Sequence, residues 1–127
     1  VLLQKSSRAP IACALNPGVD TLGVRIPDNK FIRAVCRQHR GALALTSANV
    51  SGQRSSLSVD EFEALWSACD VVFDGGAISS SRKGSTIVDL TVAGEYRLVR
   101  QGEGLEKAVD VLENKFKLTK QGGDSLL

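Results

Sequence analysis

The residues that most often build metal centres and covalent catalytic sites are scarce in this chain. Its 127 residues include one histidine, three cysteines and no methionine. The odd number and wide spacing of Cys13, Cys36 and Cys69 argue against a disulfide framework and against a Cys-x-x-Cys metal site. His39 has no carboxylate close to it in the sequence. We therefore expect neither a bound metal nor a nucleophile that is activated by histidine.

Long apolar runs and a strong net charge are lacking as well. Glycine, aspartate or arginine interrupts every apolar stretch well short of a bilayer span, and the first residues lack a signal-peptide pattern. We expect no membrane partner and a cytoplasmic location, with mitochondrion and plastid also compatible. The net charge of +2 is too small to indicate a nucleic-acid-binding protein by itself. The chain also starts at Val1 as if already inside a strand, so we interpret it as a fragment.

What the sequence does contain is an alternation of apolar segments and amphipathic segments. Strands are expected at residues 1–4, 11–15, 21–26, 42–45, 71–73, 85–90 and 96–100, and helices at 28–39, from 58 onward and at 105–116. This order predicts an α/β fold with a twisted mixed sheet and flanking helices. One domain is expected over residues 1–116, and residues 117–127 are expected to form a flexible tail.

The helix that begins at Ser58 has a distinct local pattern. Ser58 and Glu61 have the spacing of a capping box, in which each side chain bonds a backbone amide of the other residue. Phe62, Leu65 and Trp66 follow at helical spacing and are expected to form the buried stripe. We interpret Trp66 as a core residue.

The segment Thr46–Gly52 is the first candidate site. It places small polar side chains directly after the apolar run Ala42–Leu45, which reads as a buried strand. Ligands of open α/β sheets bind where strands end in this way. An ordinary polar turn is the alternative, because Ser, Asn and Gly are common in turns.

Three other strand ends are polar or basic. They are Arg25 before Pro27, the segment Lys83–Thr86, and Arg100 with Gln101 and Gly102. If these ends converge, they form a pocket for an anion such as phosphate or carboxylate. Neither a P-loop nor a Rossmann glycine pattern is present. Positioning and charge stabilisation therefore fit better than covalent chemistry.

Several motifs together resemble the YrdC/Sua5 family of threonylcarbamoyl-AMP synthases. In chain order they are Val24-Arg25-Ile26-Pro27, Leu45-Thr46-Ser47-Ala48-Asn49-Val50-Ser51-Gly52, Phe73-Asp74-Gly75-Gly76, Gly84-Ser85-Thr86-Ile87-Val88-Asp89 and Val99-Arg100-Gln101-Gly102. The similarity extends from Val1 to about Phe116, and the joint order is more specific than any single motif.

The resemblance implies an enzyme, a nucleotidyltransferase, that condenses L-threonine, bicarbonate and ATP into L-threonylcarbamoyladenylate and pyrophosphate. ATP would enter with Mg²⁺ as a substrate. A partner threonylcarbamoyl transferase then modifies the adenosine next to the anticodon in certain tRNAs, which is the t6A modification. Carried over by motif, the expected threonine-binding residues are Arg25, Thr46 and Ser85, and the expected nucleotide-binding residues are Ser47, Asn49, Thr86 and Arg100. No catalytic residue is assigned, and Asp74 is interpreted as structural.

One departure from the family concerns the start of the domain. The family's domain begins earlier, with a Lys-x-Arg motif ahead of the strand in which Val1 lies, so we expect the N-terminal part to be missing and this chain to be inactive alone. An alternative is an RNA-binding or scaffold module that contacts tRNA or double-stranded RNA through Arg82, Lys83, Arg97 and Arg100. A domain cut from a hydrogenase-maturing carbamoyltransferase is a third possibility, against which the polar tail argues.

Overall fold

A computed structural model describes residues 1–6, 15–78 and 81–122 of the chain. It divides into two compact units where the sequence suggested one continuous domain. The first unit consists of residues 1–28 and 85–127, and the second consists of residues 29–84. We describe each unit by itself.

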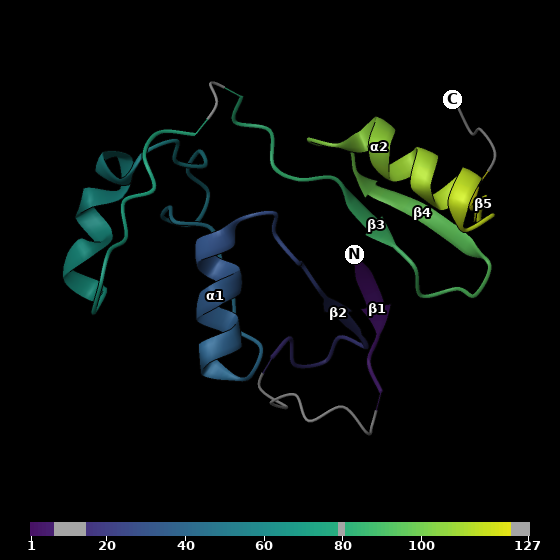
Figure 1. Ribbon diagram of the computed structural model, residues 1–127, viewed down its shortest axis with the longest axis horizontal. Coiled ribbons are helices and arrows are strands. Elements are labelled where there is room, and N and C mark those ends of the chain that lie inside the picture. The colour runs from purple at the N-terminus through teal and green to yellow at the C-terminus, as the bar shows by residue number, and fades with distance from the viewer. Residues whose placement is uncertain (7–14, 79–80, 123–127) are drawn as a thin grey trace. The chain divides into compact units, whose positions relative to one another are not determined.

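The first unit is built on a mixed five-stranded sheet, shown in Figure 1. Its strands are β1 (Leu2–Gln4), β2 (Thr21–Gly23), β3 (Ile87–Asp89), β4 (Glu95–Arg100) and β5 (Thr119–Lys120), in the order β2-β1-β3-β4-β5. β1 pairs antiparallel with β2 and parallel with β3, while β4 pairs antiparallel with β3 and parallel with β5. The predicted α/β class with a mixed sheet is therefore confirmed.

The core of this unit lies between the sheet and the last helical run. The run begins as α2 (Leu105–Asp110) and continues as a wider π-helical turn, η2 (Val111–Lys115). Leu112 on this run is buried against Val88 of β3 and Tyr96 of β4, whose side chain is only 1% exposed. Because apolar burial is the main stabilising contribution to folding, this cluster holds the unit together.

The expected hairpin between residues 85 and 100 is confirmed, with a shorter first strand. Gly94 has a φ of +80° in the turn that joins β3 to β4, a conformation that glycine adopts without strain. The flexible tail that we expected from Lys117 onward contains β5, so the expectation is wrong for Thr119–Lys120. The Thr119 amide bonds the Gly94 carbonyl at 3.0 Å, which ties this segment to the hairpin turn.

The described residues of the second unit form two helical segments. α1 (Lys30–His39) is capped at its start by Asn29, whose side chain accepts a hydrogen bond from the Ile32 amide, and at its end by Arg40, which has a left-handed φ of 57°. The second segment, η1 (Val59–Ala68), is a 3₁₀ helix. The capping box is wrong in detail, because Ser58 makes no side-chain cap bond and Glu61 accepts instead from the Leu57 amide at 3.2 Å.

Two predicted strands of this unit do not form. Residues 42–45 and 71–73 have no strand structure, and Leu45, Val71 and Phe73 are 72%, 62% and 65% exposed. A strand is stable only when its backbone groups pair with a neighbouring strand, and the described residues supply no such neighbour for either segment.

The prediction that Trp66 is a core residue in a buried stripe of this helix is wrong. Its side chain is 36% exposed, and its indole nitrogen donates to the Val59 carbonyl at 3.2 Å. The strand expected at residues 11–15 lies almost entirely outside the described residues.

Candidate functional site

A hollow of about 400 Å³ lies within the second unit, and its size is typical of small-molecule pockets. Three stretches that are separated in sequence supply most of its walls. The lining residues are Asn29, residues 47–49 and 55–59, Phe62, Phe73, Gly75, Gly76 and Ile78. The loop after the expected strand 42–45 therefore borders a pocket even though that strand is not formed.

The amide of Asn49 organises the loop side of the hollow. Its nitrogen donates to the carbonyl oxygens of Val50 at 2.9 Å and Gln53 at 3.3 Å. Its Oδ1 atom is buried and has no hydrogen-bond partner among the described residues. Buried polar atoms are nearly always hydrogen-bonded, so this oxygen is an exception to the usual pattern.

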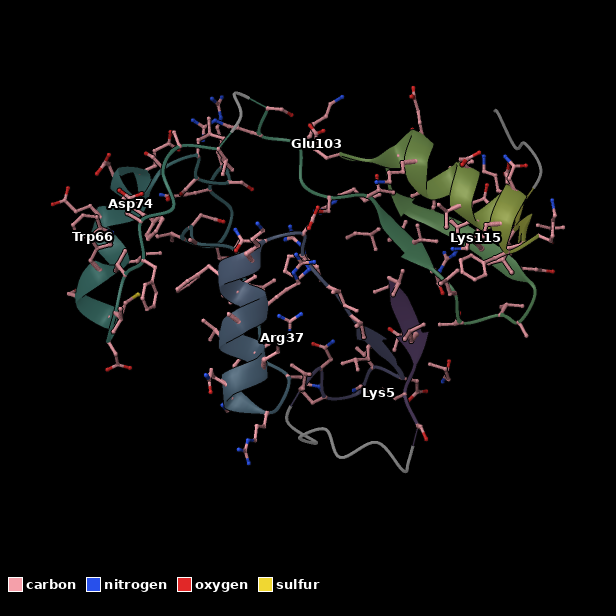
Figure 2. The ribbon with its side chains drawn as sticks, viewed as in Figure 1. Lys5, Arg37, Trp66, Asp74, Glu103 and Lys115 are labelled. Carbon is pink, nitrogen blue, oxygen red and sulfur yellow. The ribbon has the colours of Figure 1, made fainter. Side chains whose placement is uncertain are left out.

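Short hydrogen bonds connect the walls of the hollow. The Ser56 hydroxyl donates to the Ala48 carbonyl at 2.8 Å, and the Ile78 amide donates to the Leu57 carbonyl at 2.8 Å. Asp74, which Figure 2 labels, accepts from the Gly76 amide at 2.7 Å. This bond shapes the turn that carries Gly75 and Gly76, so the structure gives Asp74 a local structural role.

The ring of Phe73 joins this wall to α1. Its centroid lies 4.8 Å from that of Phe31, with the two rings tilted by 54°. Such a tilted arrangement is favourable for aromatic pairs. Phe73 is thus both a lining residue of the hollow and a packing partner of the helix.

A second group of predicted site residues gathers in the first unit. The Arg100 guanidinium donates to the Ser85 carbonyl through Nε at 3.1 Å and Nη2 at 2.8 Å. The Thr86 hydroxyl lies 3.0 Å from the carbonyl oxygens of both Gly102 and Glu103, and it accepts from the Gly102 amide at 3.1 Å. Arg100 therefore fixes the carbonyl of Ser85, and Thr86 ties the residue after Ser85 to the backbone of Gly102 and Glu103.

The predicted site residues are thus divided between the two units. Arg25, Ser85, Thr86 and Arg100 belong to the first unit, and Thr46, Ser47 and Asn49 belong to the second. Within its unit, each of Arg25 and Thr46 is exposed and makes no side-chain hydrogen bond to the described residues. Ser47 and Asn49 meet at the hollow, and Ser85, Thr86 and Arg100 meet beside β4.

An ion pair in the second unit was not anticipated from the sequence. Arg82 Nη1 lies 2.7 Å from Glu61 Oε2, and Nη2 lies 2.9 Å from Oε1, so the contact is bidentate. Nη1 also donates to the Ser55 carbonyl at 2.6 Å. The bonds from Arg82 and from the Leu57 amide lower the pKa of the Glu61 carboxyl, and the pair raises the pKa of Arg82. The partners are 21 residues apart, and no local pattern links them.

Asp89 forms a second unanticipated cluster, in the first unit. The carboxylate is buried and accepts from the Thr91 hydroxyl at 2.7 Å, the Thr91 amide at 2.9 Å and Arg97 at 2.7 Å. The Thr91 hydroxyl, followed by Arg97, lowers the pKa of Asp89 to about 2. Three arginines of the predicted RNA surface, Arg82, Arg97 and Arg100, are therefore engaged in contacts within the protein.

The described residues contain no group of three or more histidine, cysteine, aspartate or glutamate side chains that could hold a metal ion. None of the helices found in the described ranges has the length and apolar character needed to cross a membrane.

Comparison with known proteins supplies the family. Residues 1–102 match the family model Sua5_yciO_yrdC, which is described as "Telomere recombination". Proteins named threonylcarbamoyl-AMP synthase are similar to this chain. Those of mouse and human are 45% and 44% identical to it over 114 and 109 residues, which are 86% and 82% of this chain.

A bacterial protein of the same name, from Serratia proteamaculans (strain 568), is 31% identical over 96 residues, or 76% of this chain and 49% of the bacterial protein. The matched residues make up 41% of the mouse protein and 39% of the human protein, so the chain spans about two fifths of their length. No solved structure matches this chain. The family match covers most of the sequence, and the chain therefore belongs to the Sua5/YciO/YrdC family.

Proposed function

We propose that the protein to which this chain belongs is a threonylcarbamoyl-AMP synthase. It would condense L-threonine, bicarbonate and ATP into L-threonylcarbamoyladenylate and release pyrophosphate and water. The family match and the name shared by the mouse, human and bacterial relatives support this reaction. The structural observation that carries the proposal is the hollow bordered by Ser47 and Asn49, two of the residues assigned to the nucleotide from the family motifs.

The hollow suits the base or sugar of a nucleotide. Its lining combines apolar side chains, such as Phe62, Phe73 and Ile78, with several serines and Asn49. Apolar side chains can pack against a base, and serine hydroxyls can donate to or accept from its polar edge. Thr86 and Arg100 are assigned to the nucleotide from the family motifs alone, and Mg²⁺ would arrive with the triphosphate.

Threonine is assigned to Arg25, Thr46 and Ser85. A guanidinium group binds a carboxylate through two parallel hydrogen bonds, and hydroxyl groups are suited to the ammonium and hydroxyl groups of threonine. Because no covalent nucleophile is proposed, the protein would accelerate the reaction by holding the carbamate oxygen in line with the α-phosphate and by stabilising the charge that develops there.

The product would pass to a threonylcarbamoyl transferase that modifies tRNA, and we place the reaction in the cytoplasm. Direct contact with tRNA or double-stranded RNA is the alternative function. Its support is weakened by the internal contacts of Arg82, Arg97 and Arg100. RNA binding would be strongly dependent on salt and indifferent to threonine, which separates the two functions.

The test is ATP binding and product formation by the complete protein that contains this chain. We expect Ser47→Ala and Asn49→Ala to weaken ATP binding about tenfold, which is the effect of losing a hydrogen bond in a binding site. Ser51→Ala is the matched control, because Ser51 belongs to the same motif but does not line the hollow. Calorimetry gives the dissociation constants, and chromatography of reactions with labelled threonine reports the adenylate. Unchanged ATP affinity in both variants would contradict the site, and absence of the adenylate in the unmodified protein would contradict the reaction.

A further inference from the structure

Arg82 connects its own segment to two residues of the second unit that lie 27 and 21 positions earlier in the sequence. Its guanidinium contacts the Ser55 carbonyl and both carboxylate oxygens of Glu61, at distances between 2.6 and 2.9 Å. Ser55 lines the hollow, whereas Arg82 and Glu61 do not. Arg82 therefore affects the hollow indirectly, through its hydrogen bond to the lining residue Ser55.

Glu61 extends the same connection to the next part of the wall. Its Oε2 atom accepts both from Arg82 and from the Leu57 amide, at 2.7 and 3.2 Å. The Leu57 carbonyl in turn accepts from the Ile78 amide. The stretch 55–57 is thus held at Ser55 by Arg82 and at Leu57 by Glu61 and Ile78. We call Arg82 and Glu61 the clasp.

The clasp contributes little to the stability of the fold, so stability does not account for its geometry. Both side chains are 37% exposed, and ion pairs with that much solvent contribute little to the stability of a fold. The fork of the guanidinium does, however, fix directions, because two parallel bonds and a third bond from the same group define one orientation. The consequence of the clasp is therefore the position of the Ser55 to Leu57 backbone.

We propose that Arg82 and Glu61 are positioning residues for ligand binding, and that their bidentate contact holds the 55–57 wall where the hollow accepts its ligand. The choice of ATP as this ligand rests on the proposed function. Neither residue is proposed to touch the nucleotide.

The test compares four single variants of the complete protein: Arg82→Ala, Arg82→Lys, Glu61→Ala and the control Arg37→Ala. Arg37 lies on α1 in the same unit, is exposed, does not line the hollow, and its guanidinium has no polar partner within the described part of the chain. The measured quantity is the dissociation constant for ATP by calorimetry.

The positioning role and simple charge attraction predict different ATP affinities for two of these variants, Glu61→Ala and Arg82→Lys. If Arg82 and Glu61 acted only through their charge, Glu61→Ala would strengthen the binding of anionic ATP and Arg82→Lys would leave it unchanged. If they form a clasp, both changes break the bidentate contact, and each weakens ATP binding about tenfold because the wall is displaced. Arg37→Ala stays within about threefold of the unmodified protein, since only an exposed charge that does not line the hollow is lost.

A double variant adds a check on the pair. Because the two residues act as one unit, Glu61→Ala with Arg82→Ala is expected to bind ATP no more weakly than either single variant. ATP affinity in Glu61→Ala that equals or exceeds that of the unmodified protein would overturn the proposal. Equal losses in Arg82→Ala and Arg37→Ala would overturn it as well.

A readout without a ligand separates failure of this proposal from failure of the proposed function. If the unmodified protein does not bind ATP, the proposed function is wrong, and the clasp is judged by hydrogen exchange at the Leu57 and Ile78 amides. Faster exchange at both amides in Arg82→Ala than in Arg37→Ala supports the clasp. Equal exchange in the two variants overturns it.

Discussion

The carboxylate of Asp89 illustrates how much of the first unit depends on single polar contacts. It is 8% exposed and ends β3, and every hydrogen bond it accepts comes from Thr91 or Arg97. A buried carboxylate is tolerated only when donors replace the water that it has lost. The Thr91 and Arg97 donors meet that requirement where β3 turns toward β4.

The stability of the first unit should therefore depend on pH through Asp89. The pKa of Asp89 is lowered to about 2, so its ionised form stabilises the fold above the ordinary carboxyl pKa of about 4, and this contribution is lost as the pH falls toward 2. We expect Asp89→Asn to be less stable than the unmodified chain at pH 7, and the difference to shrink between about pH 4 and pH 2. Urea unfolding across this pH range measures it.

Asp20→Asn is the matched control for this prediction. Asp20 lies in the same unit, and its side chain is exposed. The prediction is contradicted if the difference in unfolding free energy between Asp89→Asn and the unmodified chain stays constant down to pH 2. The loss of stability would then come from the changed shape of the side chain and not from its charge.

Single residues also mark the limit of what the sequence could reveal about the site. The Ser47 to Asn49 loop could be proposed because small polar residues directly follow an apolar run, and the loop does border a hollow. The roles of these residues stay predictions. The contact between Arg82 and Glu61 could not be proposed, because it joins residues that are distant in sequence through side chains with many rotamers.

At the scale of elements, the helical run from α2 to η2 is held to the sheet mainly by one side chain. Leu112 is 8% exposed and packs in the cluster with Val88 and Tyr96, whereas Phe116 just beyond the run is 60% exposed. The two residues are four positions apart, a spacing that places both on one face of the helix predicted at residues 105–116. The structure thus separates two residues that the helical pattern treats alike.

Truncating these two side chains should therefore give different losses of stability. We expect Leu112→Ala to lower the free energy of unfolding by about 2–4 kcal/mol, since it removes buried methyl groups and leaves a cavity. Phe116→Ala, the control, should cost less than about 1 kcal/mol because much of the ring is already in contact with water. Urea denaturation of the chain measures both. Equal losses would mean that Leu112 is not the anchor.

The elements differ in how well local sequence determines them. The hairpin of β3 and β4 was predictable because alternating residues flank a turn that contains Gly94, and its two strands are each other's partners. The segments 42–45 and 71–73 have equally strong apolar patterns but no partner strand among the described residues. A strand depends on its neighbours, so an apolar pattern alone cannot decide whether it forms.

For the molecule as a whole, burial is unevenly distributed. Within the described ranges, the buried residues Val88, Asp89, Tyr96 and Leu112 all belong to the first unit. The second unit exposes large apolar side chains, including Leu45, Phe73 and Ile78. Since local stability follows apolar burial, the two units should differ in how readily they open.

Hydrogen exchange of this chain should show that difference. We expect amides of β3 and β4 to exchange at least about tenfold more slowly than amides of α1, because opening the sheet exposes the Tyr96 cluster and opening α1 exposes no buried side chain. Mass spectrometry of peptides or amide-resolved NMR measures the rates. Similar protection in β4 and α1 would show that the second unit has a stable core of its own.

The position of the lone tryptophan has a practical consequence. Trp66 is the only tryptophan in the chain and lies in the second unit, while the only tyrosine, Tyr96, lies in the first. Excitation at the red edge of the absorption band selects the indole, so the emitted light reports on η1 and not on the sheet. Because the indole is partly exposed and bonded to Val59, the colour of its emission would change if η1 unwound. The chain therefore carries a built-in optical reporter for one of its two units, with no dye attached.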